Sequence, residues 1–354
     1  MKPKHLTTIT FFCLLALGLF INAMAQRGQD AAAESSYRLS GPYTHGNLTV
    51  FLVHGKDLTN KTFLTLQEAL AQKKVRVYET KDVNELAIRN LSNQDIYVQA
   101  GDIVRGGDQD RMISIDFIVP PNSGRMPIAA FCVESGRWSK RGNEENASFG
   151  SSENMIATKD LKLAAKRERS QEAVWKNVSV AQEKLSANVG GNVQASASAS
   201  SLELTVENAK VKENTEAYIK ALSGILQNKS DVIGFVFAIN GHVNSADVYA
   251  SRGLFAKLWP KLLKASAVEA VAELNKDVEA KPVATEVVHT FLTDSEKARA
   301  EAREVTPSAP AATSGKSTEA EPKVSTVTDT KLDVHKLTVA SVTPTGDTCA
   351  TAAR

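Results

Sequence analysis

The chain has 354 residues and a formal net charge of +2, from 42 basic and 40 acidic side chains. This near-neutral balance provides no general attraction to nucleic acid or to anionic lipid, so we expect no nucleic-acid polymer among its partners. The length is sufficient for one large or two ordinary domains with a substantial core.

The first 25 residues have the parts of a secretory signal peptide. Lys2 and Lys4 form a basic start, residues 9–21 are apolar, and residues 23–25 read Ala-Met-Ala, the small side chains that signal peptidase requires. The apolar run is shorter than the roughly 18 residues of a membrane span. We therefore expect cleavage after Ala25 and a secreted or periplasmic protein that carries no membrane span. Cleavage would leave 40 basic and 40 acidic residues, and no net charge.

Composition divides the rest of the chain into three parts. Residues 26–46 are polar and rich in small side chains, which predicts a flexible leader. Residues 47–302 alternate strand-like and helix-like patterns, and predict one large α+β domain with a mainly antiparallel sheet and helices packed on one face. Residues 303–354 hold little apolar surface, which predicts a largely disordered tail.

The first half of the predicted domain is mainly β-structure. Residues 47–54 alternate as a strand does, and Thr65 with Glu68 forms a capping box that opens a short helix to about residue 72. Further strands are predicted at 75–79, 85–89 and 96–99, and the apolar runs 112–120 and 126–133 continue the sheet.

The second half is mainly helical, with one hairpin. The predicted elements, in order, are a polar loop at 139–152, a helix at 168–185, a flexible connection at 190–201, a helix at 207–226, a buried strand at 232–239, a return strand at 242–249, and helices at 253–274 and 285–302. Asn240-Gly241 favours a two-residue hairpin turn, and Pro260 is expected to kink or divide its helix. The helical segment 156–226 would be an insertion that covers the sheet.

The stretch from residue 100 to 138 places charged groups inside sequence that otherwise predicts buried strand. Its first charged cluster follows two glycines and comprises Gly106, Gly107, Asp108, Gln109, Asp110 and Arg111. The glycines allow a sharp turn or a close approach to a ligand, the acids could bind ribose hydroxyls, and the guanidinium could bind a phosphate. A β-turn braced by an internal Arg–Asp pair explains the same residues.

The second charged cluster comprises Glu134, Arg137 and Trp138. Trp138 offers a stacking face for a base or a sugar ring, and Arg137 offers a planar guanidinium with several N–H donors. A tryptophan at this position could equally be buried at the edge of the hydrophobic core. Asp110 and Glu134 are the candidate pair for acid–base catalysis, and their separation decides whether they can act together.

Metal, cofactor and nucleophile signals are weak. The six histidines are scattered without metal-ligand spacing, no nucleotide-binding motif and no GxSxG elbow occurs, and Cys132 has no base beside it in sequence. We therefore expect no metal and no cofactor. Whether Cys132 and Cys349 form a disulfide is left open by their positions.

Several motifs in order resemble the ARPP family, the ARG and rhodanese-phosphatase-superfamily-associated protein domain. They are FLTLQEAL, AGDIVRGGDQDR, IDFIVPPNSGRMPIAAFCVESGRW and the segment from DVIGFVFAINGH to LLKASAVEA, and they cover about residues 47–291. The matching positions are Gly101, Gly106, Gly107, Gln109, Asp110, Arg111, Cys132, Glu134, Gly136, Arg137 and Trp138. The resemblance implies no specific activity or residue role. Its name points to ADP-ribose chemistry, which we discount for an exported member because such nucleotides are mainly intracellular.

Three hypotheses follow. The first is an exported domain that binds a small polar ligand, nucleotide-like or sugar-like, through the two clusters. The second is a hydrolase that acts on an ADP-ribose-like or glycosidic substrate through Asp110 and Glu134, and the third is a structural or protein-interaction module of the cell envelope. An open pocket formed by Arg111, Asp110, Glu134 and Arg137 would favour the first two, whereas internal pairing beneath the surface would favour the third.

Overall fold

The structure is a computed structural model that describes residues 37–80, 82–137, 149–155, 158–277, 282–297, 341–342 and 348–349. Within these residues, helices and mainly antiparallel sheets form one compact unit, which confirms the predicted α+β class. The expected signal peptide, and the part of the expected leader before residue 37, lie outside the described residues.

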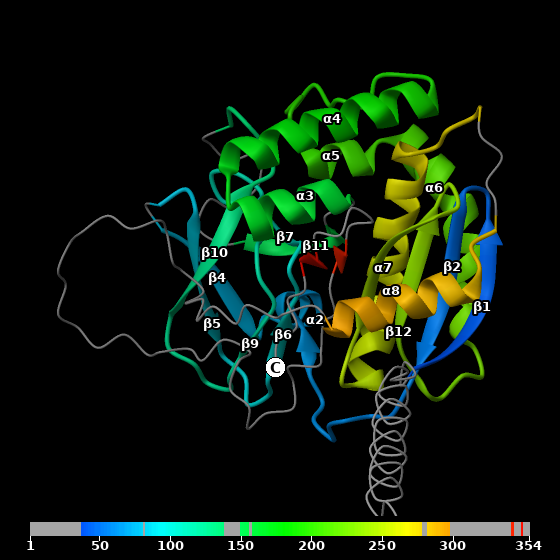
Figure 1. Ribbon diagram of the computed structural model, residues 1–354. Coiled ribbons are helices and arrows are strands. Elements are labelled where there is room, and N and C mark those ends of the chain that lie inside the picture. The colour runs from blue at the N-terminus through cyan, green and yellow to red at the C-terminus, as the bar shows by residue number, and fades with distance from the viewer. Residues whose placement is uncertain are drawn as a thin grey trace, which may run out of the picture. The chain divides into compact units, whose positions relative to one another are not determined.

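The first sheet has four strands in the order β1-β2-β12-β13 (Figure 1). Their bounds are β1 (Arg38–His45), β2 (Leu48–His54), β12 (Val232–Ile239) and β13 (His242–Val248). β2 and β12 are buried along their whole length, as their apolar sequences require. Asn240 and Gly241 both have positive φ, 52° and 78°, so the predicted hairpin turn is present.

The prediction of a flexible leader is wrong for residues 38–45, which form β1. Cross-strand pairs such as Leu39 with Val53 and Thr44 with Thr49 join this segment to β2. An edge strand is held by backbone hydrogen bonds to its neighbour, so its side chains can be polar. β1 is also interrupted at Gly41-Pro42, where its register with β2 shifts. Composition alone therefore did not identify this strand.

A six-stranded sheet in the order β11-β7-β8-β10-β5-β4 and a three-stranded sheet in the order β3-β6-β9 hold the charged stretch. The bounds are β3 (Leu64–Thr65), β4 (Val75–Glu79), β5 (Glu85–Asn90), β6 (Ile96–Val98), β7 (Asp102–Gly106), β8 (Arg111–Ile113), β9 (Phe117–Val119), β10 (Met126–Cys132) and β11 (Phe149–Met155). β3 and β6 pair in parallel, and the other pairs of these two sheets are antiparallel.

β11 corrects the prediction of a polar loop for residues 149–152, whereas residues 139–148 lie outside the described residues. Its first residue, Phe149, is buried and pairs with Gly106 of β7. The segment has no strand-like alternation of apolar and polar side chains. It forms a strand because pairing with β7 supplies the stabilisation that its side chains do not.

The helices are α2 (Leu66–Ala71), α3 (Lys159–Leu163) with a following π-helical turn (Ala164–Glu168), α4 (Gln171–Val189), α5 (Leu202–Glu207), α6 (Ala209–Leu222) with a 3₁₀ turn (Ser223–Leu226), α7 (Arg252–Ala272) and α8 (Thr285–Lys297). The capping box predicted at Thr65 and Glu68 is present at the start of α2. Pro260 lies inside α7, which continues through it as one helix.

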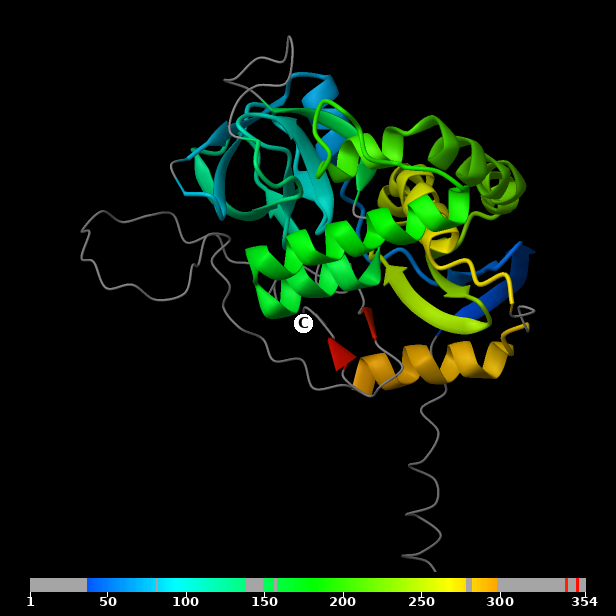
Figure 2. The same ribbon diagram turned by 90° about the horizontal axis from the view of Figure 1, so that it is seen from above.

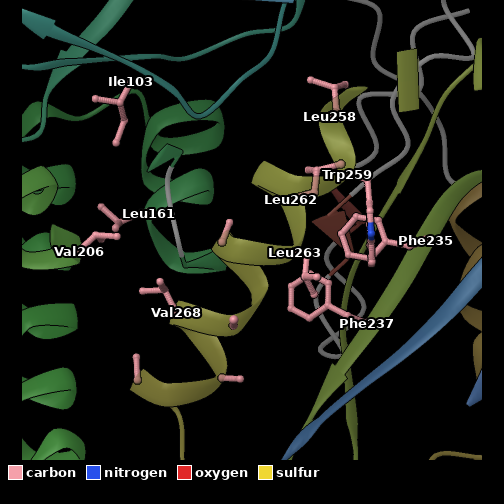
Figure 3. Close-up of a cluster of buried hydrophobic side chains, with 14 of the residues drawn as sticks. Ile103, Leu161, Val206, Phe235, Phe237, Leu258, Trp259, Leu262, Leu263 and Val268 are labelled. Atoms are coloured by element: carbon pink, nitrogen blue, oxygen red, sulfur yellow. The ribbon is translucent and has the colours of Figure 1, made fainter. Parts of the chain in front are cut away.

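The main core lies between the four-stranded sheet and α7 (Figure 3). Phe235 and Phe237 point from β12 toward α7, and the ring centroids of Phe235 and Trp259 are 5.4 Å apart in an edge-to-face arrangement. α8 packs on the opposite face of this sheet, where Val288 and Leu292 are buried (Figure 2). The main helical layer is thus on one face, and α8 adds a cover on the other.

Residues 303–354 are largely outside the described part. Two short strands, β14 (Ser341–Val342) and β15 (Thr348–Cys349), are described there and pair with each other. Among the helices that the structure describes, none has both the length and the apolar character of a membrane span.

Candidate functional site

The charged residues singled out in the sequence meet at one end of the six-stranded sheet. β7 and β8 are adjacent antiparallel strands joined by the loop 107–110, and β10 lies next to β8 with Cys132 opposite Arg111. Glu134 and Arg137 follow the end of β10. We call Glu79, Asp110, Arg111, Glu134 and Arg137, with Gln109, the signature cluster.

The loop between β7 and β8 requires its two glycines. Gly106 and Gly107 have φ of 118° and 58°, conformations that side chains with a Cβ rarely adopt. A Cβ on Gly107 would also lie 2.6 Å from Cζ of Phe149 and closer still to Oε1 of Glu79. The backbone N–H of Gly106 donates to Oδ1 of Asp110 at 3.0 Å, so the aspartate side chain connects the two ends of the loop.

Arg137 joins the two charged clusters. Its Nε donates to Oε2 of Glu134 at 2.8 Å, and its Nη2 lies 3.5 Å from Oδ1 of Asp110. Both carboxylates have 0% side-chain exposure and Arg137 has 8%. One guanidinium therefore neutralises two enclosed acids from different parts of the stretch.

Arg111 is held on the other side of the loop. Its Nη2 lies 3.5 Å from Oε2 of Glu79, and its Nη1 donates to Oε1 of Gln109 at 3.3 Å. Oε1 of Glu79 accepts the backbone N–H of Asp108 at 3.0 Å, while the side chain of Asp108 is exposed. Sequence reasoning missed Glu79, because it lies on β4 about 30 residues before its partners and resembles any polar strand end.

A second layer of contacts fixes the cluster to the helices. Nε1 of Trp175 on α4 donates to the backbone carbonyl of Glu134 at 3.2 Å. Gln171, at the start of α4, bonds both backbone groups of Cys132 at 2.8 Å. The end of β10 is therefore attached to α4 by side chains that have no obvious sequence signal.

Arg105 on β7 points to a further pair of acids. It bonds Oε1 of Glu207 at 2.8 Å and lies 3.7 Å from Oε1 of the buried Glu203, both on α5. Ser152 on β11 also donates to Glu203, at 2.8 Å. Sequence reasoning missed this group because α5 was not predicted as a separate helix.

Burial shifts the pKa of two groups in or beside the cluster. It raises the pKa of Glu79 above its usual range, although the positive charge of Arg111 lowers it in part. It also raises the pKa of the Cys132 thiol to about 11, against a smaller lowering by Arg111. The thiol is thus protonated at neutral pH and is a poor nucleophile.

Three enclosed atoms of the cluster have no hydrogen-bond partner: Nε2 of Gln109, Nε of Arg111 and Oε1 of Glu134. They include both donors and an acceptor. An unsatisfied buried polar atom costs roughly 1–3 kcal/mol, so such atoms call for a water molecule, a ligand or a functional reason.

The structure thus brings together Gly106, Gly107, Gln109, Asp110, Arg111, Glu134 and Arg137 of the predicted site residues, and it leaves the side chain of Asp108 at the surface. Trp138 lies outside the described residues. Among those residues, no group of three or more His, Cys, Asp or Glu side chains has the arrangement of a metal site.

A family model described as ARG and Rhodanese-Phosphatase-superfamily-associated Protein domain matches residues 36–343. The match extends beyond the motifs at both ends and includes β1. Comparison with curated proteins and with solved structures found no match.

Proposed function

The chain belongs to the ARG and rhodanese-phosphatase-superfamily-associated protein domain family, and we propose that it is an exported structural or protein-interaction module whose signature cluster is an internal brace. The observation that carries this proposal is the pairing of Asp110, Glu134 and Arg137 beneath the surface. A side chain that is already paired and enclosed holds strands together more readily than it receives a partner from solvent.

The charge balance of the cluster also weighs against capture of an anionic ligand. Three carboxylates, of Glu79, Asp110 and Glu134, surround the guanidiniums of Arg111 and Arg137. A phosphate would have to displace a carboxylate that is already in place and would meet the remaining acids at short range. This balance disfavours ADP-ribose and other nucleotides as ligands of this cluster.

The brace is tested by a double-mutant cycle between Asp110→Asn and Arg137→Met, measured as the free energy of unfolding. Each single change removes one charge of an enclosed ion pair, so we expect coupling of about 1–3 kcal/mol between the two sites. Arg76→Met on the exposed side of β4 is the matched control and should change stability by less than about 0.5 kcal/mol. Additive effects of the two changes would contradict an internal brace.

Export is tested separately, because it rests on the first 25 residues. Mass spectrometry of protein from the periplasmic or extracellular fraction should find an N-terminus at Gln26. Ala25→Phe should block cleavage, whereas Ala32→Phe, beyond the site, should leave it unchanged. Full-length protein confined to the cytoplasm would contradict export.

The interaction role is tested by chemical cross-linking in intact cells that express the chain at its native level. A discrete adduct of constant size is expected with the native chain and with Arg76→Met. A chain that remains uncross-linked at every reagent concentration would contradict this role.

A second candidate function is the binding of a small polar ligand, favoured by the three unpartnered atoms of Gln109, Arg111 and Glu134. Their mixed donor and acceptor character suits a sugar-like compound better than a phosphate. Glu79, whose side chain is 22% exposed, is the member of the cluster most accessible from solvent.

A thermal-shift screen on protein without residues 1–25 tests this candidate with cell-wall sugars, nucleotides and ADP-ribose. A ligand at about 100 times its dissociation constant adds about 2.7 kcal/mol of stability. Glu79→Gln should weaken the shift, and Asp108→Asn, with its exposed side chain, should not. The absence of a shift with every compound, or an equal shift in Glu79→Gln, would rule this candidate out.

A hydrolase that uses Asp110 and Glu134 receives less support. Both carboxylates are enclosed, and Arg137 occupies an oxygen of each. A general acid or base must come within hydrogen-bond reach of its substrate, and neither side chain does so while the brace is intact.

A further inference from the structure

Three polar side chains meet at one end of the four-stranded sheet, away from the residues of the signature cluster. Ser40 lies on β1, His54 is the last residue of β2, and Asp231 immediately precedes β12. β1, β2 and β12 are neighbours in the sheet (Figure 1), and His54 lies opposite both Arg38 and Val232. We call Ser40, His54 and Asp231 the sheet-end triad.

Strand register explains why these side chains converge. Ser40 lies opposite Leu52, so Ser40 and His54 are diagonal neighbours on the same face of the β1–β2 pair. Asp231 is fixed beside His54 because its backbone carbonyl accepts the N–H of Gly55 at 2.9 Å. All three positions are therefore set by backbone pairing.

The distances are those of a nucleophile, a base and a group that orients the base. Oγ of Ser40 lies 2.7 Å from Nε2 of His54, and Nδ1 of His54 lies 2.7 Å from Oδ1 of Asp231. When Nδ1 carries the proton and donates to the carboxylate, Nε2 is free to accept the serine hydroxyl proton. This relay is the arrangement that activates a serine.

Arg38 contacts both the carboxylate of Asp231 and the imidazole of His54. Its Nη2 lies 2.5 Å from Oδ2 of Asp231 and 2.9 Å from Nδ1 of His54. A guanidinium only donates, so its contact with Nδ1 is a hydrogen bond only in the other tautomer, in which Nδ1 is unprotonated and Nε2 donates to Ser40. In the tautomer that activates Ser40, Nδ1 donates to Oδ1 of Asp231, and Arg38 bonds Oδ2 alone. The hydrogen bond from His54, and then that from Arg38, lower the pKa of Asp231, which is therefore ionised at neutral pH.

Exposure differs along the triad. His54 is 4% exposed, whereas the side chain of Asp231 is 49% exposed and Ser40 is half-buried. β1 is the outer strand of this sheet within the described residues, and Ser40 is partly exposed, so solvent reaches the serine while the base is held in place. A substrate would therefore be a small molecule or a flexible segment that reaches the sheet edge.

We propose that the sheet-end triad is a nucleophilic site that transfers the acyl group of a small carboxylic ester to water. Oγ of Ser40 forms a bond to the carbonyl carbon while Nε2 of His54 takes the hydroxyl proton. The bond to the alcohol oxygen then breaks, and the alcohol leaves with the proton from His54. An ester is preferred to an amide because an alkoxide leaves more readily than an amide nitrogen.

Water completes the reaction. It attacks the acyl-serine carbonyl while His54 takes its proton, and the proton then returns to Oγ of Ser40 as the carboxylic acid departs. Asp231 keeps the imidazole in the required orientation and stabilises it when it is doubly protonated. This inference goes beyond the proposed function and is independent of the signature cluster.

The test uses the purified full-length chain and two probes, a fluorophosphonate and 4-nitrophenyl acetate. The fluorophosphonate should form an adduct that peptide mass spectrometry locates on Ser40. Ser40→Ala and His54→Gln should lower the rates of labelling and of ester hydrolysis by about 10²-fold or more, the usual contribution of a positioned base. Ser230→Ala, next to Asp231, is the matched control and should leave both rates unchanged.

Asp231→Asn keeps the proposal testable if His54→Gln fails to fold, because the side chain of Asp231 is half-exposed. It should retain the native melting temperature within a few degrees and lower the rate of Ser40 labelling about 10-fold or more. The proposal is overturned if the probe labels other serines only, if no adduct forms, or if Asp231→Asn is labelled as fast as the native chain.

Discussion

The signature cluster and the sheet-end triad are two polar groups of opposite character. The cluster is assembled mainly from residues that are close in sequence, and it is buried with its charges paired internally. The triad is assembled from residues 40, 54 and 231, and it is partly open to solvent. Charged motifs that stand out in a sequence are therefore not necessarily the groups best placed for chemistry.

The difference has a physical basis. An enclosed charge is tolerated only when a partner balances it, and that requirement ties Asp110, Glu134 and Arg137 to one another. A half-exposed carboxylate such as that of Asp231 has water as an alternative partner, so its contacts need not contribute much to stability. The following predictions separate the two regions by the size of the stability change.

The largest change is expected for Glu134→Ala in the signature cluster. Removing this carboxylate leaves Arg137 with less compensation in an enclosed site, and the unfolding free energy should fall by about 3–5 kcal/mol. Urea titration followed by circular dichroism measures this loss of unfolding free energy. A loss below about 1 kcal/mol would show that the cluster is not a brace.

A buried acid without a guanidinium partner provides a contrast to the cluster. Glu269 on α7 is 4% exposed, and its Oε1 accepts the backbone N–H of Lys159 at 2.8 Å and Nδ2 of Asn244 at 3.1 Å. Burial raises its pKa from 4.5 to about 7. The folded state therefore holds a proton that the unfolded state releases above about pH 4.5.

The sign of the pH effect follows from this raised pKa. The stability due to Glu269 is fully present below about pH 4.5 and is lost as the pH rises through about 7, with a total of about 3 kcal/mol. Glu269→Gln removes this loss, so the variant should be more stable than the native chain at pH 8 and similar to it at pH 4.5. Urea unfolding of both proteins at the two pH values measures the difference in unfolding free energy between the variant and the native chain. The same difference at pH 8 and at pH 4.5 would contradict the raised pKa of Glu269.

Gly107→Ala tests the loop that positions the cluster. The positive φ and the contacts with Phe149 and Glu79 should together cost about 2–3 kcal/mol. Gly136→Ala is the matched control, because Gly136 also has a positive φ but an added Cβ would meet no atom within 4 Å. The melting temperatures should therefore fall more for Gly107→Ala, and equal decreases would show that backbone strain alone is responsible.

The smallest change is expected at the triad. Asp231→Asn loses a charged contact at a half-exposed site and should cost less than about 1 kcal/mol of unfolding free energy. The same urea titration measures it. A loss comparable with that of Glu134→Ala would mean that the sheet end is also a structural brace.

The sequence by itself determined the fold class and most of the regular elements. The capping box at Thr65, the hairpin at Asn240-Gly241 and the apolar strand 232–239 were predicted because each depends on local backbone geometry or on a strong apolar pattern. Whether the two charged clusters meet was left open, because their separation depends on how β8 and β10 pair.

Tertiary structure alone decided the rest. β1 and β11 exist because neighbouring strands pair with them, which their own composition does not indicate. Glu79 became a partner of Arg111, and Ser40 and Asp231 became neighbours of His54, only through strand order and register. Periodicity reports the face on which a residue lies, whereas the side chain that it meets is set by pairing between distant segments.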